Sequence, residues 1–334
     1  MAPILEIDQL QVSLFTRAGV LPAVDGLSLT VDAGETVAIV GESGCGKSLS
    51  ALAVMRLLPE PPARIIGGAI RLAGRDLVPI SEREMRRVRG KEISMIFQDP
   101  MTSLNPVVPI GEQLAEAIRQ HNPMPYRDAL TRAVALLQRV RIPDAERRLN
   151  DYPHQLSGGM SQRVMIAMAI ACEPKVLIAD EPTTALDVTI QAQILQLMKE
   201  LQAASGMALI IITHDLGVVA ETADRVVVMY AGRKVEEAPV EALFERPLHP
   251  YTRGLLGATP SATRQHGGRL ADIAGNVPSL ADLPAGCAYA GRCALAFDRC
   301  RTERPALSEP SRHRLTACFA TEQEMLRDVA PVGA

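Results

Sequence analysis

The sequence predicts an α/β fold followed by a small second unit, and three observations support this prediction. From residue 4 to about residue 240, strand-like and helix-like patterns alternate, as in proteins whose helices cover a sheet. A glycine-rich loop at 41–48 lies between an apolar strand pattern and a helical pattern. After residue 248 the chain becomes a series of short apolar stretches between Pro, Gly and Arg. We therefore expect one domain at 1–248 and a C-terminal extension at 249–334.

The strands are predicted from two kinds of hydrophobic pattern. Residues 4–12 and 27–31 alternate apolar and polar positions, which is typical of edge strands with one polar face. Thr36–Val40 (TVAIV) is apolar throughout, as in a buried central strand. Further apolar runs predict strands at 93–97, 176–179, 208–212 and 226–229.

The helices are predicted from apolar residues at helical spacing. This spacing occurs at 48–58, 111–119, 127–140, 162–172 and 190–204. Strand patterns vanish after Asp99, and amphipathic helices such as the one containing Leu130, Val134 and Leu137 replace them. We expect a helical subdomain at about 99–171, inserted into the α/β core.

Composition excludes several classes of protein. Of the 334 residues, 47% are hydrophobic and 22% are charged, which argues against wholesale disorder. The net charge is −3 and only 3% of residues are aromatic, so we expect no nucleic-acid partner. The longest apolar runs are far shorter than the ~18–20 residues of a membrane-spanning helix, so any role at a membrane is expected from its surface.

The loop at Gly41–Ser48 (GESGCGKS) fits the pattern of a phosphate-binding loop, and it has the required strand before it and helix after it. Glycines allow backbone N–H groups to turn toward phosphate oxygens, and the helix N-terminus favours the anion. Lys47 would contact the β- and γ-phosphates, and the Ser48 hydroxyl would bind Mg²⁺. The predicted nucleotide-binding residues are Gly41, Glu42, Ser43, Gly44, Cys45, Gly46, Lys47 and Ser48.

The segment Val176–Pro182 (VLIADEP) places two carboxylates at the end of a predicted strand, where ligands of α/β proteins bind. Asp180 suits the Mg²⁺ site. Glu181 suits a general base that accepts the proton of an attacking water. Taken alone, the two acids are weak evidence, since acids are also common at a helix N-terminus, but together with the phosphate loop they are strong evidence.

The segment Leu156–Gln162 (LSGGMSQ) precedes a long helical pattern and offers a second site for an anion. Ser157 supplies a hydroxyl, and Gly158 and Gly159 allow close approach of the backbone. Taken alone, the segment is better explained as an ordinary helix start with Ser157 as N-cap.

GESGCGKS, LSGGMSQ, VLIADEP and Thr213-His214-Asp215, in this order, resemble the ATP-binding cassette (ABC) family over roughly residues 4–240. The resemblance implies a P-loop NTPase fold with a RecA-like core, an antiparallel edge sheet and an inserted helical subdomain. It also implies a head-to-tail pair of cassettes, with ATP between the phosphate loop of one subunit and the LSGG segment of the other.

The resemblance assigns roles to four further positions. Gln98 matches the glutamine that meets Mg²⁺ and water, and His214 matches the histidine that touches the γ-phosphate. Asp187, in Ala-Leu-Asp at 185–187, matches an aspartate at the dimer contact. Phe15 is the candidate for the aromatic ring that stacks on adenine.

Four segments are similar to the peptide-permease branch, namely QDPMTSLNP at 98–106, YPHQLSGGMSQR at 152–163, DEPTTALD at 180–187 and HPY at 249–251. The resemblance implies an ATPase subunit that powers import of di- or oligopeptides. It would lie peripherally on the cytoplasmic side of a bacterial inner membrane. Its partners would be a second ATPase subunit, two transmembrane permease subunits and a periplasmic substrate-binding protein. The alternatives are a nickel or glutathione importer and, more remotely, a soluble ABC ATPase with a redox-sensing tail.

Four cysteines in the extension, Cys287, Cys293, Cys300 and Cys318, have the spacing C-x5-C-x6-C-x17-C. Four thiolates can hold Zn²⁺ or an iron–sulfur cluster, although the lack of C-x-x-C argues against a zinc ribbon. The resemblance to peptide-permease ATPases implies a [4Fe–4S] cluster, but Ala288 and Ala294 depart from the proline-containing pattern of that extension. Four buried free thiols are the alternative.

Overall fold

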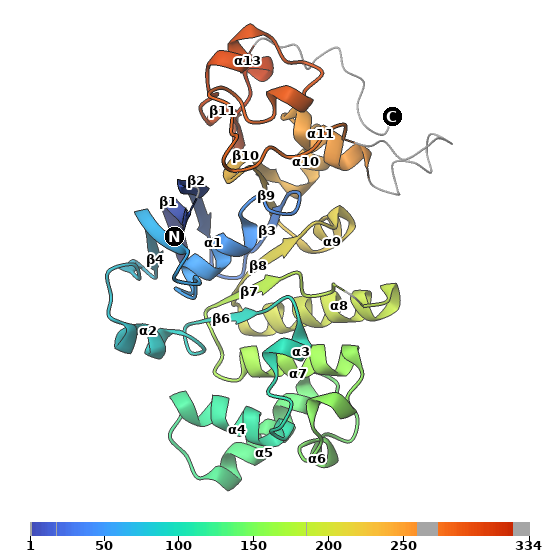
Figure 1. Cartoon of the computed structure of the whole chain (residues 1–334). Helices are drawn as coiled ribbons and strands as arrows, with labels where there is room; N and C mark the ends of the chain where they lie inside the picture. Colours follow the sequence, from blue (N-terminus) through green and yellow to red (C-terminus); the bar gives the residue numbers. More distant parts are fainter. Residues whose placement is uncertain (1, 18, 185, 259–272, 323–334) are drawn as a thin grey trace. The chain divides into compact units, whose positions relative to one another are not determined.

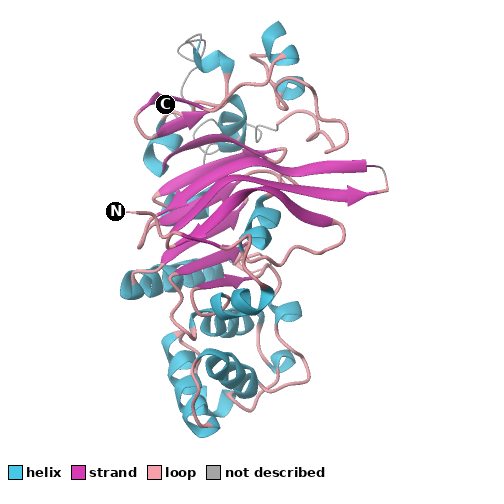
Figure 2. Cartoon of the chain, turned by 90° about the vertical axis from the view of Figure 1, so that its left-hand side faces the viewer, coloured by secondary structure: helices cyan, strands magenta, loops and turns pink. Residues whose placement is uncertain are grey.

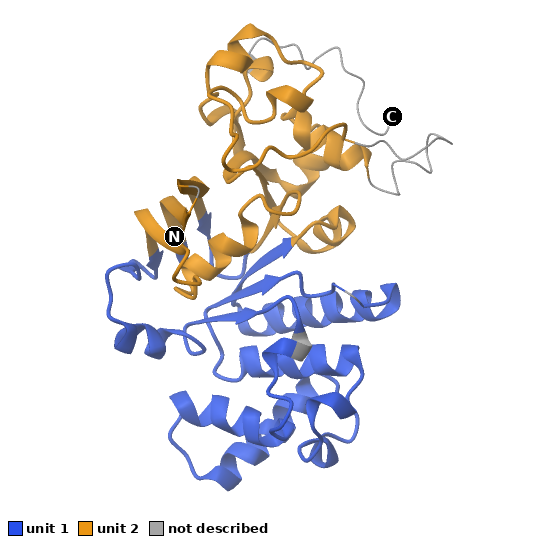
Figure 3. Cartoon of the chain, viewed as in Figure 1, with its two compact units in different colours: residues 1–5, 30–35, 71–212 blue, residues 6–29, 36–70, 213–334 orange. Residues whose placement is uncertain are grey.

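The computed structural model (Figure 1) describes residues 2–17, 19–184, 186–258 and 273–322. The chain forms two compact units (Figure 3), each of which is described by itself. Unit 1 comprises residues 1–5, 30–35 and 71–212, and unit 2 comprises residues 6–29, 36–70 and 213–334.

Three parallel strands form the sheet of unit 1, in the order β8, β7, β6 (Figure 1). They are β6 (Ile93–Ile96), β7 (Val176–Asp180) and β8 (Ala208–Thr213). Every residue of the three strands is buried. The strands predicted from continuous apolar runs are therefore confirmed, since such runs are typical of buried parallel strands. Helix α8 (Val188–Ser205) connects β7 to β8, beginning at the N-cap Asp187 and ending at Gly206 with φ +68°.

The helical part of unit 1 contains α3 (Pro100–Ser103), α4 (Ile110–His121), α5 (Tyr126–Arg139), α6 (Ala145–Arg148), the 3₁₀ turn η1 (Pro153–Gln155) and α7 (Gly158–Ile170). Helix α7 is the central element, because it contacts α3, α4, α5, α8 and β6. The predicted replacement of strands by helices in this region is confirmed. Unit 1 also holds the short strand β5 (Arg75–Asp76), which pairs with the end of β4, and helix α2 (Glu82–Val88).

Unit 2 contains β1 (Leu5–Thr16), β2 (Gly19–Val31) and β4 (Ala63–Leu72), which lie side by side in the order β2, β1, β4. Its second sheet includes β3 (Thr36–Val40), which runs parallel to β9 (Arg225–Tyr230), and β10 (Arg233–Pro239), which is antiparallel to β9. The helices are α1 (Lys47–Val54), α9 (Leu216–Thr222), α10 (Val240–Glu245) and α11 (Pro250–Gly257).

The extension adds two strands to this second sheet, whose strands are magenta in Figure 2. Strand β12 (Arg314–Thr316) pairs antiparallel with β10, and β11 (Ser308–Ser311) pairs antiparallel with β12. The remaining described elements are η2 (Ala290–Arg292), α13 (Asp298–Thr302) and α14 (Phe319–Glu322). The sheet of unit 2 therefore runs β11, β12, β10, β9, β3.

The sequence pattern missed two long strands. Strand β4 contains two adjacent glycines, and a Cβ at Gly68 would lie 2.4 Å from the backbone oxygen of Gln9. The glycine is needed there for close approach of two strands, but it breaks the apolar alternation. Strand β10 was missed because it carries the half-buried Lys234 and the buried Glu236 and Glu237, and Lys234 pairs with Glu237.

Candidate nucleotide-binding site

The phosphate loop lies in unit 2, between β3 and α1, as the sequence predicts. Gly41 has φ +151°, and a Cβ on it would lie 2.2 Å from the carbonyl oxygen of Met229. Gly46 has φ +100°, and its Cβ would lie 2.6 Å from the carbonyl oxygen of Ala23. Neither position can hold a side chain, because the conformation and the space both require glycine.

Lys47 is oriented by the loop itself. Its Nζ donates hydrogen bonds to the carbonyl oxygens of Gly41 at 2.7 Å and Glu42 at 3.1 Å, and the residue is 6% exposed. The ammonium group is thus fixed inside the loop, whereas Ser43, Gly44 and Ser48 are exposed. A buried cation, exposed backbone and a helix N-terminus together are the chemistry that binds a nucleotide phosphate.

Cys45 is a packing residue of this loop. It is buried, and burial raises the pKa of its thiol, with Lys47 opposing the rise. Its carbonyl oxygen accepts a hydrogen bond of 3.0 Å from the backbone N–H of Gly232. Since a buried, protonated thiol is a poor nucleophile, the residue serves the loop by filling space.

Asp180 and Glu181 lie in unit 1, at the carboxyl end of β7. Asp180 is 5% exposed. The Glu181 carboxylate accepts a hydrogen bond of 2.8 Å from the Thr184 hydroxyl and one of 3.2 Å from the Gln98 side-chain amide. The structure therefore brings Gln98 and Glu181 together, and it adds Thr184, which the sequence did not single out.

The backbone of Glu181 adopts a left-handed conformation with φ +47°. Such a conformation costs a non-glycine residue on the order of 1 kcal/mol or more. Its N–H donates a 2.8 Å hydrogen bond to the carbonyl oxygen of Ile212, which holds the chain in place. Strained residues of this kind cluster at functional sites, and this one carries the predicted general base.

The LSGG segment forms the start of α7. The Ser157 hydroxyl accepts a 3.4 Å hydrogen bond from the N–H of Met160, so Ser157 is the N-cap of this helix. A Cβ at Gly159 would lie 2.8 Å from Cγ2 of Ile190, and one at Gly158 would lie 3.7 Å from Cδ2 of Leu186. The segment therefore packs against the start of α8 within unit 1.

Asp187 caps α8 by accepting a 2.9 Å hydrogen bond from the N–H of Ile190. Ser157, Gly158, Gly159 and Asp187 are thus neighbours through Leu186 and Ile190. Ala185, in the same motif as Asp187, lies outside the described residues.

His214 and Phe15 lie in unit 2. His214 is exposed and directly follows β8, and Asp215 caps α9 by accepting from the N–H groups of Gly217 and Val218. Phe15 is 43% exposed, and the Arg64 guanidinium lies 5.6 Å from the centre of its ring. An exposed ring is available for stacking, but the roles of both residues stay predictions.

The four cysteines of the extension line one cavity of about 20 Å³. In the part of the chain that the structure describes, no three His, Cys, Asp or Glu side chains are arranged to hold a metal ion. Burial raises the pKa of Cys287 to about 11 and also raises the pKa values of Cys293 and Cys318. As they stand, the thiols of Cys287, Cys293 and Cys318 favour the protonated form, and the four cysteines are not arranged as a metal site.

Two residues of the extension contact the phosphate loop, and the sequence analysis assigned neither of them to the site. The Arg292 guanidinium makes two hydrogen bonds to the Glu42 carboxylate, of 2.7 and 3.0 Å. The Tyr251 hydroxyl accepts a 2.8 Å hydrogen bond from the N–H of Glu42. The HPY motif gave a sequence signal for Tyr251, whereas no motif pointed to Arg292.

Among the described helices, none is both long enough and apolar enough to cross a membrane. Residues 24–184 match the family model described as "ABC transporter", and residues 235–300 match the one described as "Oligopeptide/dipeptide transporter, C-terminal region".

Relatives match over nearly the whole chain. The "Probable peptide ABC transporter ATP-binding protein y4tR" of Sinorhizobium fredii is 52% identical, with 96% of each chain covered. The "Oligopeptide transport ATP-binding protein AppD" of Bacillus subtilis is 50% identical, with 97% of this chain and 98% of the relative covered. Among solved structures, the dimeric post-hydrolysis state of the ATP-binding cassette MJ0796, bound to ADP and Pi, matches with a TM-score of 0.64 and 26% identity. That match covers 71% of this chain and 98% of the other.

Proposed function

This chain belongs to the ABC transporter family, and on that premise we propose that it is the ATP-hydrolysing subunit of an importer of di- and oligopeptides. The observation that carries the proposal is the combination of two parts in one chain. One part is an ATP-binding cassette with a phosphate loop, and the other is the C-terminal region found in oligopeptide/dipeptide transporters.

In the proposed reaction, Lys47 and the loop N–H groups bind the phosphates of ATP, and Phe15 stacks on the adenine. Glu181 accepts the proton of the attacking water, Gln98 orients the Glu181 carboxylate, and His214 contacts the γ-phosphate. Ser48, Asp180 and Gln98 would hold Mg²⁺, which supplies positive charge opposite the phosphates. The loop supports this assignment because Ser43, Gly44 and Ser48 are exposed beside the buried side chain of Lys47.

We propose that hydrolysis needs two cassettes. Ser157, Gly158 and Gly159 of one subunit would complete the phosphate site of the other, with Asp187 at the contact. A helix start that packs closely on the neighbouring helix offers a rigid surface for this purpose. The test is the ATPase rate per subunit during dilution. The rate should fall as the pair dissociates, and an isolated subunit with the full rate would contradict the proposal.

The remaining partners are two transmembrane permease subunits, a periplasmic substrate-binding protein and a second ATPase subunit, identical or homologous. The complex would place this chain peripherally on the cytoplasmic side of a bacterial inner membrane, with no nucleic-acid partner. Co-fractionation with membranes that contain the permeases tests this location, since a soluble ABC ATPase would stay in the supernatant.

The cargo is tested with the reconstituted complex in vesicles. ATP hydrolysis should rise when the binding protein is loaded with a dipeptide or an oligopeptide. A rise with a nickel complex or glutathione, and none with peptides, would favour the alternative importers.

We propose the division into a cassette at 1–248, with its helical subdomain at about 99–171, and an extension at 249–334. For the extension, an iron–sulfur or zinc site at Cys287, Cys293, Cys300 and Cys318, which line one cavity, stays a prediction from the sequence. No step of the proposed reaction uses this group. Metal analysis and absorption spectra of protein purified without oxygen test it, and metal-free protein would leave four buried thiols.

A further inference from the structure

The phosphate loop contains an acidic side chain, although the loop is expected to bind the negatively charged phosphates of ATP. Glu42 is the second residue of the loop, and its carboxylate would repel the phosphates of ATP if its charge were not compensated. The two hydrogen bonds from Arg292 provide this compensation in the parallel geometry that guanidinium groups make with carboxylates. The two residues are separated by 250 positions in the sequence, so this pairing is a product of the fold.

Arg292 is held firmly on its own side. Its side chain is 6% exposed, and it also donates to the carbonyl oxygens of Ala274 at 3.0 Å and Ile273 at 3.1 Å. Its guanidinium lies 5.9 Å from the ring centres of Tyr230 and of Tyr289. A side chain with this many partners has one position, and it therefore fixes the position of the carboxylate that it binds.

A second contact comes from Tyr251, whose hydroxyl accepts from the N–H of Glu42. Tyr251 is itself fixed, because its N–H donates a 3.1 Å hydrogen bond to Nδ1 of His249 and its ring packs 4.7 Å from that of Tyr230. The N–H of His249 in turn donates to the buried carboxylate of Glu236 on β10. Backbone and side chain of Glu42 are thus both held from the C-terminal side of the chain.

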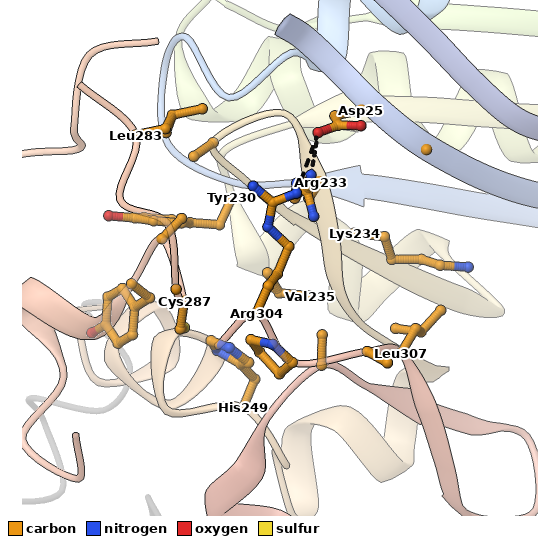
Figure 4. A pocket seen from close by; sticks show the side chains of 18 of the residues that line it. Asp25, Tyr230, Arg233, Lys234, Val235, His249, Leu283, Cys287, Arg304 and Leu307 are labelled. Carbon is orange, nitrogen blue, oxygen red and sulfur yellow. Dashed lines mark hydrogen bonds and ion pairs between the residues drawn. The ribbon is translucent and has the colours of Figure 1, made fainter. Parts of the chain in front are cut away.

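Unit 2 contains a further, indirect connection between the extension and the loop. Arg304 lies 3.8 Å from the carboxylate of Asp25 on β2, to which Arg233 also pairs (Figure 4). The N–H of Asp25 donates to the carbonyl oxygen of Gly232, whose N–H donates to the carbonyl oxygen of Cys45 in the loop. These charged groups line a cavity of about 460 Å³, together with Leu283 and Cys287 of the extension (Figure 4).

We propose that Arg292 is a positioning residue of the nucleotide site, which compensates the charge of Glu42 and thereby makes ATP affinity depend on the folded extension. The proposal rests on ATP binding by this chain and is independent of the cargo. The proposal predicts that the effects of Arg292 and Glu42 on ATP affinity depend on each other. Loss of Arg292 should weaken ATP binding mainly because it leaves the charge of the Glu42 carboxylate uncompensated.

The test is a double-mutant cycle in the full-length protein, with a fluorescent ATP analogue and Mg²⁺ as the probe. Arg292→Met should weaken binding of the analogue about tenfold, in line with loss of a charged hydrogen-bonded pair. The same change in a Glu42→Gln background should weaken binding by no more than about twofold. Arg292→Lys, which keeps the charge and loses the paired geometry, should lie between Arg292→Met and the unmodified protein. In steady state, the KM for ATP should rise more than kcat falls.

The matched control is Arg299→Met, because Arg299 belongs to the same extension but pairs with Glu303 and lies 3.9 Å above the ring of Phe319. It should lower the thermal midpoint without changing the affinity for the analogue. An equal loss of affinity for Arg292→Met with and without the Glu42→Gln substitution would overturn the proposal, as would a loss no larger than that of Arg299→Met. Failure of ATP binding in the unmodified protein would instead overturn the proposed function.

Discussion

The side-chain amide of Gln98 donates a 3.2 Å hydrogen bond to the carboxylate of Glu181, although 83 positions separate the two residues. Gln98 follows β6 and Glu181 follows β7, and these two strands are parallel neighbours. Because parallel strands end at the same edge of a sheet, two polar residues just beyond their ends meet there. This pairing gives the predicted general base a fixed orientation.

Glu181→Gln should abolish most ATP hydrolysis while leaving nucleotide binding intact. The amide cannot accept the proton of the attacking water, so we expect kcat to fall by about 100-fold or more. Turnover assays combined with titration of an ATP analogue check this expectation. Near-normal turnover would show that Glu181 is not the base.

Gln98→Ala and Thr184→Val each remove a side-chain donor to the Glu181 carboxylate. We expect each variant to lower kcat by about tenfold, in line with loss of one hydrogen bond to a charged group. If Thr184 acts only through Glu181, Thr184→Val should lower kcat little further in a Glu181→Gln background, whereas Gln98→Ala should lower it further because Gln98 is also proposed to hold Mg²⁺. An additive loss for Thr184→Val in that background would show an independent role.

Lys47→Ala should prevent tight binding of ATP. Lys47 is the buried cation of the loop, and its removal leaves the carbonyl oxygens of Gly41 and Glu42 without their donor. We expect affinity for a fluorescent ATP analogue to fall by about tenfold or more. Lys199→Ala, at an exposed position of α8, is the control and should bind the analogue normally.

Gly159→Ala should destabilise the protein even though alanine favours helices, because its Cβ would lie 2.8 Å from Cγ2 of Ile190. We expect a loss of about 1–3 kcal/mol in the free energy of unfolding. The double variant Gly159→Ala, Ile190→Ala should recover part of this loss, since the clashing methyl group is gone. Gly158→Ala meets only an ordinary contact at 3.7 Å, so it should be neutral or slightly stabilising. Thermal or denaturant unfolding of the variants and of the unmodified protein measures these differences in stability.

His249 should make stability depend on pH. It is 1% exposed, and burial lowers its pKa to about 3 from the ordinary value of 6.5. The unfolded chain therefore takes up a proton as the pH falls through 6.5, while the folded protein does not. The contribution of neutral His249 to the free energy of unfolding is complete above pH 6.5. It decreases by about 1.4 kcal/mol per pH unit as the pH falls toward 3.

The matched variant is His249→Asn, which keeps a side-chain acceptor for the N–H of Tyr251 and removes the titration. The buried Glu236 carboxyl, whose pKa burial raises, acts in the opposite direction but is present in both proteins. The difference in unfolding free energy between the two proteins should shrink from about pH 7 to about pH 5.5. A constant difference would contradict the neutral, buried state of His249.

The sequence by itself determined the parts of the site that lie close together along the chain. The phosphate loop at 41–48, the helix start at Ser157 and the acids at the end of β7 were each predicted at the correct element, because strand, glycine and helix signals are local. The central strands followed from their apolar runs for the same reason.

Only the tertiary structure decided which distant residues meet. The pairs Gln98–Glu181 and Arg292–Glu42 form because separate elements pack side by side, and no local pattern encodes such a meeting. Strand β10 was hidden for a related reason. The N–H groups of Leu248 and His249 bind the buried carboxylate of Glu236, and Arg314 lies 4.0 Å from it, so its burial depends on partners that hydropathy does not represent.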